Sequence, residues 1–150
     1  MLNLRPSILD DGLEAAIRWL VDGFSRRTNI KVRLRVEQAS PVLASDVLLV
    51  AFRVAQETLT NITKHADCTA VTMDISSHEG FLTLEVTDNG RGMTRADQLK
   101  AQSFGLRGLQ ERAQSVGGWL DISSKPDQGT SVVLSIPLGG VGTTSVEDEL

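Results

Sequence analysis

Hydrophobic residues recur along this chain with two different periods. Helical spacing predicts three helices, over residues 9–27, 44–66 and 106–116. Alternation of apolar with polar residues predicts five strands, over residues 31–37, 70–76, 81–87, 119–123 and 130–137. The elements therefore follow one another as helix, strand, helix, two strands, helix and two strands.

Residues that favour turns separate these elements. Asn29 ends the first helix, and Gly117 with Gly118 ends the third, as expected where a left-handed cap closes a helix. Residues 78–80 join two strands into a hairpin, whereas residues 88–103 are polar, contain glycine and are predicted to be irregular. The turns thus support the same order of helices and strands as the hydrophobic pattern.

Paired strands between helices indicate an α+β fold. We expect a mainly antiparallel sheet of about five strands, covered on one face by about three helices. The regular alternation of strand and helix that defines a doubly wound nucleotide-binding fold is absent. Residues 1–138 are expected to form one domain, and the glycine- and acid-rich residues 139–150 a disordered tail.

Composition excludes several kinds of chemistry. The single cysteine, Cys68, rules out an internal disulfide framework, and two histidines offer little to a transition metal. A net charge of −4 with scattered basic residues argues against direct binding of nucleic acid. The chain has no apolar run of roughly 18 residues that would span a membrane, and its start does not resemble a secretory signal, so we expect a cytoplasmic location. Any chemistry must come from carboxylates, amides, glycines and an external cofactor.

The first candidate motif lies on the second predicted helix. At about 100° per residue, Glu57, Asn61 and Lys64 fall on one line at the border of the apolar stripe. The amide oxygen of Asn61 would suit Mg²⁺, and Lys64 would offer a positive charge to phosphates. The alternative is a solvated helix flank, in which Arg53 and Glu57 form an ordinary ion pair.

A second motif, residues 88–93 (DNGRGM), follows the third predicted strand. It is either a plain turn or a site in which the Asp88 carboxylate accepts a hydrogen bond from the amino group of adenine. In the second interpretation Gly90 and Gly92 let the backbone come close to the base.

Two further signals follow along the chain. Residues 104–109 (FGLRGL) open the third helix, where free amides favour a phosphate, although no Walker or dinucleotide fingerprint is present. Gly129 and Thr130 open the last strand, and Thr130 matters for function only if it faces Asp88.

The order and spacing of these four signals resemble the conserved boxes of the GHKL ATPase superfamily. The segments QETLTNITKHA (56–66), DNGRGM (88–93) and FGLRGLQERAQSVGG (104–118) are most similar to one branch of sensor histidine kinases, that of nitrate-responsive and desaturase-regulating sensors. The resemblance extends over residues 4–138. It implies a Bergerat-type α/β sandwich that binds ATP beneath a mobile lid at residues 94–104.

The resemblance also implies roles for individual residues. Asn61 would bind Mg²⁺, Lys64 and His65 would lie near the phosphates, and Asp88 would bind adenine. The remaining residues of the implied pocket and lid are Gly90, Gly92, Met93, Gly105, Leu106, Gly108 and Thr130. Two roles stay open for Glu57, namely activation of a nucleophile and polarisation of the Mg²⁺ site.

The branch phosphorylates a histidine on a dimerising helix. Neither His65, on the nucleotide-site helix, nor His78, at a hairpin, matches that position. We therefore expect this chain to be a piece of a homodimeric sensor, to bind ATP without phosphorylating itself, and to act on a dimerisation domain that passes the phosphoryl group to a response regulator of the helix-turn-helix type. Whether the parent sensor is anchored in the inner membrane stays open. The alternatives are another GHKL enzyme, such as an anti-sigma-factor serine kinase, and a non-catalytic interaction domain.

Overall fold

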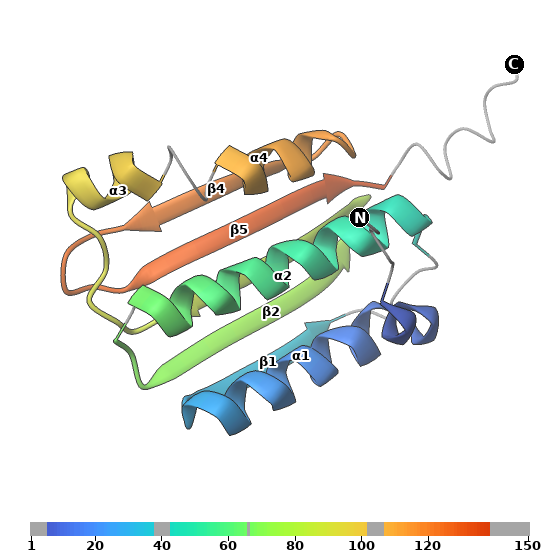
Figure 1. Ribbon diagram of the computed structural model, residues 1–150. Helices are drawn as coiled ribbons and strands as arrows, with labels where there is room; N and C mark the ends of the chain where they lie inside the picture. Colours follow the sequence, from blue (N-terminus) through green and yellow to red (C-terminus); the bar gives the residue numbers. More distant parts are fainter. Residues whose placement is uncertain (1–5, 38–42, 66, 102–106, 139–150) are drawn as a thin grey trace, which may run out of the picture.

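The computed structural model describes residues 6–37, 43–65, 67–101 and 107–138, which contain one five-stranded sheet. The strands are β1 (Lys31–Glu37), β2 (Ala70–His78), β3 (Phe81–Asp88), β4 (Trp119–Ser124) and β5 (Thr130–Pro137). Their order across the sheet is β1-β2-β3-β5-β4 (Figure 1). β1 runs parallel to β2 and the other neighbours are antiparallel, so the sheet is mainly antiparallel, as predicted.

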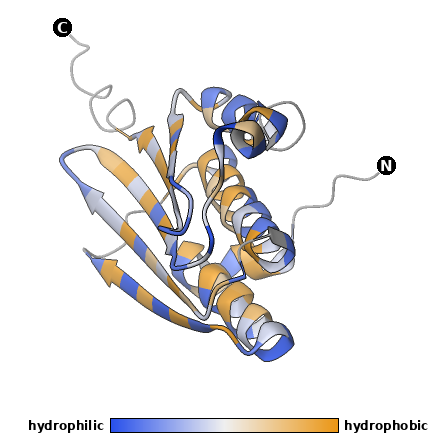
Figure 2. Ribbon diagram, turned by 90° about the vertical axis from the view of Figure 1, so that its left-hand side faces the viewer, coloured by the Kyte–Doolittle hydropathy of each residue, from blue (hydrophilic) through white to orange (hydrophobic). Residues whose placement is uncertain are grey.

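The helices are the 3₁₀ turn η1 (Ser7–Asp11), α1 (Leu13–Thr28), α2 (Ser45–His65), α3 (Arg95–Ala101) and α4 (Arg107–Gln114). α1 and α4 flank α2 on either side, and the three helices lie on the same face of the sheet (Figure 1). Figure 2 shows the two layers from the side, with the strands in one layer and the helices in the other. The predicted α+β sandwich is confirmed.

Two predictions about helices were wrong. The first helix begins at Leu13 and not at residue 9, because Gly12 adopts φ 98° and separates it from η1. The segment 88–103, expected to be irregular, contains α3. The amide of Thr94 donates to Asp97 Oδ2 and the amide of Asp97 donates to Thr94 Oγ1, both at 3.1 Å, so the two side chains cap the start of this helix.

The predicted helix ends have the expected caps. Asn29 is left-handed, with φ 61°, and its amide donates to the Ser25 carbonyl oxygen at 2.9 Å. Gly117 has φ 76°, and the amide of Gly118 donates to the Ala113 carbonyl oxygen at 2.9 Å. Both endings satisfy carbonyl groups that a helix leaves without intrahelical partners.

The core lies between the sheet and the helices. Alternate residues of the central strands point toward the helices and are buried: Leu82, Leu84 and Val86 in β3, and Val132, Leu134 and Ile136 in β5. They meet apolar side chains of α1 and α2, among them Ile17, Phe24, Phe52 and Ala55. Figure 2 shows the resulting alternation of hydrophobic and hydrophilic residues along the strands. Burial of apolar surface in this single layer is the main source of stability.

The register of the strands determines where polar groups meet. Asp88, the last residue of β3, lies opposite Val71 near the start of β2 and opposite Thr130, the first residue of β5. The end of β3 and the starts of β2 and β5 therefore lie together at one end of the sheet. In the described part of the chain, no helix has both the length and the apolar character needed to cross a bilayer.

The two faces of β5 give a direct test of this architecture. Leu134 is completely buried and pairs with Leu84 and Leu120, so Leu134→Ala should lower the free energy of unfolding by about 2–5 kcal/mol in urea denaturation. Val133, its neighbour on the other face, is only half-buried, and Val133→Ala should cost less than about 1 kcal/mol. Equal losses of unfolding free energy from the two substitutions would show that the buried and exposed faces of β5 are assigned wrongly.

Candidate functional site

The carboxyl group of Asp88 is the central feature of the site. Asp88 is only 5% exposed, because the alternation along β3 turns its side chain toward the helices. The amide of Gly90 donates to Asp88 Oδ1 at 2.8 Å, and the amide of Thr130 also hydrogen-bonds the carboxyl group. A carboxylate has about four lone-pair positions. Asp88 therefore keeps capacity to accept a further donor.

Burial raises the pKa of Asp88 above its ordinary value, and the amides of Gly90 and Thr130 oppose this shift. Because the pKa is raised, the group's contribution to stability is complete below the unfolded-state pKa and is lost as the pH rises through the folded-state pKa. Ionisation of the Asp88 carboxyl group therefore lowers the stability of the fold. Perturbed carboxyl groups of this kind concentrate at functional sites.

Asn89 fixes the turn that follows Asp88. Its Oδ1 accepts the amides of Thr69 at 3.0 Å and Ala70 at 3.1 Å, and its Nδ2 donates to Thr69 Oγ1 at 3.0 Å. These bonds tie the end of β3 to the start of β2. Sequence reasoning gave Asn89 no role. The available signal was an asparagine directly after a strand, where its side chain readily bonds nearby backbone groups.

Ser124, at the end of β4, joins the other side of the site. Its Oγ accepts the amide of Met93 at 2.8 Å and lies 2.8 Å from Thr130 Oγ1 and 3.2 Å from the Gly129 carbonyl oxygen. The structure thereby brings Met93 and Thr130 together with the Asp88 turn. Sequence reasoning also missed Ser124, because no local pattern distinguishes it from the neighbouring serine.

Two glycines allow the backbones to come into contact here. Gly92 has φ 67° and Gly129 has φ 75°. A Cβ at Gly92 would overlap the Lys125 carbonyl oxygen, and a Cβ at Gly129 would overlap that of Asp88. Both positions therefore require glycine for conformation and for space. Gly90, between Asp88 and Gly92, is buried.

On α2, Asn61 is half-buried, whereas Glu57 and Lys64 are exposed. This helix packs against α1, α4, β3 and β5. The buried residues Thr58 and Ile62 directly follow Glu57 and Asn61, so the row borders the buried side of the helix. The expected pairing of Arg53 with Glu57 is not among the ion pairs of the described residues, and Arg53 Nη1 donates instead to Gln56 Oε1 at 2.8 Å. His65 is the last residue of the helix.

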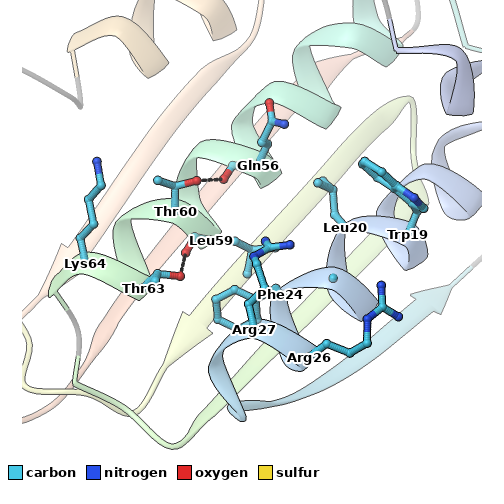
Figure 3. Close-up of a pocket in the computed structure, with 11 residues that line it drawn as sticks. Trp19, Leu20, Phe24, Arg26, Arg27, Gln56, Leu59, Thr60, Thr63 and Lys64 are labelled. Atoms are coloured by element: carbon cyan, nitrogen blue, oxygen red, sulfur yellow. Dashed lines mark hydrogen bonds between the residues drawn. The ribbon is translucent and has the colours of Figure 1, made fainter.

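A groove of about 430 Å³ lies between α1 and α2 (Figure 3). Its wall consists of Trp19, Leu20, Gly23, Phe24, Arg26, Arg27, Gln56, Leu59, Thr60, Thr63 and Lys64. Of the predicted site residues that the structure describes, only Lys64 lines this groove. The groove is therefore distinct from the cluster around Asp88, which contributes no residue to its wall.

The remaining predicted residues contribute less to the geometry. Gly108 is exposed within α4, with open space around it, whereas Gly105 and Leu106 lie outside the described residues. Cys68 is half-buried, and burial together with the charge of Asp88 raises the pKa of its thiol. Within the described ranges, no three His, Cys, Asp or Glu side chains form a group that would hold a metal ion.

Comparison with known proteins agrees with the geometry. Residues 46–140 match the family described as histidine kinase-, DNA gyrase B-, and HSP90-like ATPases. The match covers more than half of the chain, and the chain belongs to this family. The family is an ATP-binding one, so the resemblance drawn from the sequence motifs is confirmed.

Two curated relatives are sensor kinases. The chain is 36% identical to the oxygen sensor histidine kinase NreB of Staphylococcus carnosus, over 91% of this chain and 40% of that protein. It is 32% identical to the sensor histidine kinase LiaS of Bacillus subtilis, over 92% of this chain and 38% of that protein. The chain thus spans less than half the length of these relatives.

A solved structure shares the fold. The blue-light activated histidine kinase EL346 of Erythrobacter litoralis superposes with a TM-score of 0.71 at 24% identity, over 85% of this chain and 45% of that one.

The contact between Gly129 and Asp88 generates a testable prediction. Gly129→Ala would force a Cβ into the Asp88 carbonyl oxygen, so it should cost about 1–3 kcal/mol beyond the strain of a positive φ. Gly80 is a matched control: it has φ 81° but open space around it, and Gly80→Ala should cost only about 1–2 kcal/mol. Equal losses in urea denaturation would contradict the close approach at Gly129.

Proposed function

We propose that this chain is the ATP-binding catalytic domain of a sensor histidine kinase. Family membership and the two sensor-kinase relatives support this function. The observation that carries it is the buried Asp88 carboxyl group, which the backbone amides of Gly90 and Thr130 hold in place and which retains acceptor capacity. The chain's donors and acceptors suit a nucleotide, because the base could meet the Asp88 carboxylate while the phosphates would lie toward α2.

Asp88 would recognise adenine by accepting a hydrogen bond from its exocyclic amino group. A carboxylate that accepts from a neutral amine makes a charge-assisted bond, and in a buried site such a bond is strong. Thr130 lies beside Asp88 in the β3–β5 ladder and would contact the same edge of the base. Gly90, Gly92 and Met93 would line the pocket on the other side.

The phosphates would lie near the end of α2. Asn61 would supply an amide oxygen to Mg²⁺, a hard cation that accepts oxygen ligands and keeps phosphate oxygens and waters in its other positions. Lys64 and His65 would lie near the phosphates, and Glu57 would polarise the metal site. Mg²⁺ would neutralise charge on the phosphates during transfer. Gly105, Leu106 and Gly108 would belong to the lid and the start of α4.

The proposed reaction is transfer of the γ-phosphoryl group to a histidine nitrogen. The bond from phosphorus to the oxygen that leaves with ADP breaks while a bond to the imidazole nitrogen forms, with the two groups in line, and the imidazole releases a proton to solvent. The acceptor histidine would belong to a dimerisation domain of the parent sensor. A response regulator would then receive the phosphoryl group, and the parent would be a homodimer with this domain in the cytoplasm.

Calorimetric titration with nucleotides tests the proposed adenine contact separately from the proposed Mg²⁺ and phosphate contacts. Asp88→Asn should weaken the binding of ATP and of adenosine alike, by about 10- to 100-fold, because a charge-assisted hydrogen bond to the base is lost. Asn61→Asp should weaken the binding of ATP in the presence of Mg²⁺ but leave the affinity for adenosine unchanged, because only the metal and phosphate contacts are altered. Removal of Mg²⁺ with EDTA should weaken ATP binding to the wild type.

Asp121→Asn is the matched control for the change at Asp88, since Asp121 is exposed on β4. Its affinity for ATP should equal that of the wild type. Unchanged binding of ATP by Asp88→Asn would refute the adenine assignment, and a wild-type chain that binds no ATP in Mg²⁺ would refute the proposed function.

Phosphotransfer in trans tests the kind of kinase. We expect the chain alone to incorporate no label from γ-labelled ATP, and to label a histidine-bearing dimerisation fragment of a sensor kinase from this branch when one is added. Phosphohistidine is acid-labile, whereas phosphoserine is acid-stable, so acid treatment of the product distinguishes the two enzymes. Acid-stable label would favour a serine kinase of the same superfamily.

A further inference from the structure

Thr58 is an unusual residue of α2. Among the described residues, the two polar or charged residues that are buried are Thr58, at 4% exposed, and Asp88, at 5%. Asp88 has backbone partners, but Thr58 Oγ1 has no hydrogen-bond partner within the described part of the chain. A buried hydroxyl without a partner is destabilising, and native proteins rarely keep one without a reason.

The other two threonines of α2 make a hydrogen bond within the helix that Thr58 does not make. Thr60 Oγ1 donates to the carbonyl oxygen of Gln56 and Thr63 Oγ1 donates to that of Leu59, both at 3.0 Å. Bonding to the carbonyl four residues back is the usual way in which a threonine within a helix satisfies its hydroxyl. Thr58 does not make this bond, so its buried hydroxyl keeps unused capacity both to donate and to accept a hydrogen bond.

The position of Thr58 indicates which group would use this capacity. Thr58 lies one helical turn before Asn61, on the side of α2 turned further toward the sheet. α2 packs against β3 and β5, and Asp88 projects from β3 into the same layer. Thr58 on α2 and Asp88 on β3, the two buried polar residues of the described chain, therefore both belong to the layer between the helices and the sheet.

We propose that the hydroxyl of Thr58 is a further nucleotide-recognition group, which hydrogen-bonds the adenine base, directly or through one water molecule. The proposal rests on the proposed function and adds a residue to its base-binding site. A hydroxyl both donates and accepts, so it can bond a purine nitrogen or a water that the base holds. Binding of the base would then satisfy the hydroxyl that the free protein leaves unpaired.

A pair of substitutions separates recognition from packing. Thr58→Val keeps the shape and removes the hydroxyl, so it should raise the Kd for ATP about five- to tenfold, while the Tm of the free protein stays equal or rises. Thr58→Ser keeps the hydroxyl and removes a methyl group, so it should lower the Tm but keep the Kd within about twofold of wild type. Calorimetry with ATP and thermal unfolding without nucleotide supply the two measurements.

Thr63→Val is the matched control, because Thr63 is exposed and its hydroxyl is already bonded within the helix. Its affinity for ATP should equal that of the wild type. If Thr58→Val binds ATP as tightly as the wild type, or Thr58→Ser loses as much affinity as Thr58→Val, the proposal is wrong and Thr58 serves packing alone. In those cases Asp88→Asn still weakens ATP binding. Absence of ATP binding by the wild type would overturn the proposed function and this proposal together.

Discussion

The site depends on one close contact between backbones. Gly129 lies against the carbonyl group of Asp88, so closely that no side chain fits between them. In the same place Asp88 pairs with Thr130 as the last pair of the β3–β5 ladder. The position of the carboxyl group is therefore determined by the two central strands and by the core beneath them. A functional group on rigid strands is held more precisely than one on a loop.

This arrangement lowers the stability of the fold. Burial favours the neutral form of Asp88, whereas a carboxylate is the form that accepts hydrogen bonds without donating one. The amides of Gly90 and Thr130 compensate only in part, and the unpaired hydroxyl of Thr58 adds to the loss. Both groups would gain partners when a base binds. Sites that bind ligands commonly accept such local instability, which the apolar core elsewhere offsets.

Much of this structure could be predicted from the sequence, for identifiable reasons. β1 and β5 were predicted to the residue, because strict alternation of apolar and polar residues reveals a sheet with one covered face. α3 was missed because it has few apolar residues and is started by the Thr94–Asp97 cap, a local hydrogen-bond pattern that hydrophobic spacing does not report. The motif residues of the proposed site were predicted from glycine and acid spacing. Their connection through Ser124 was not, because it joins Met93 to a residue 31 positions away.

Residues of α2 differ in how firmly the fold holds them. Thr58 and Asn61 are buried or half-buried, so their conformations are restricted before any ligand arrives. Lys64, one helical turn after Asn61, is exposed and lines the groove shared with α1. Under the proposed function, base and metal would thus meet groups already in position, whereas the charge of Lys64 would be drawn in by the phosphates. Buried groups at the base and metal together with an exposed Lys64 at the phosphates would suit a site that binds ATP and must release ADP after each transfer.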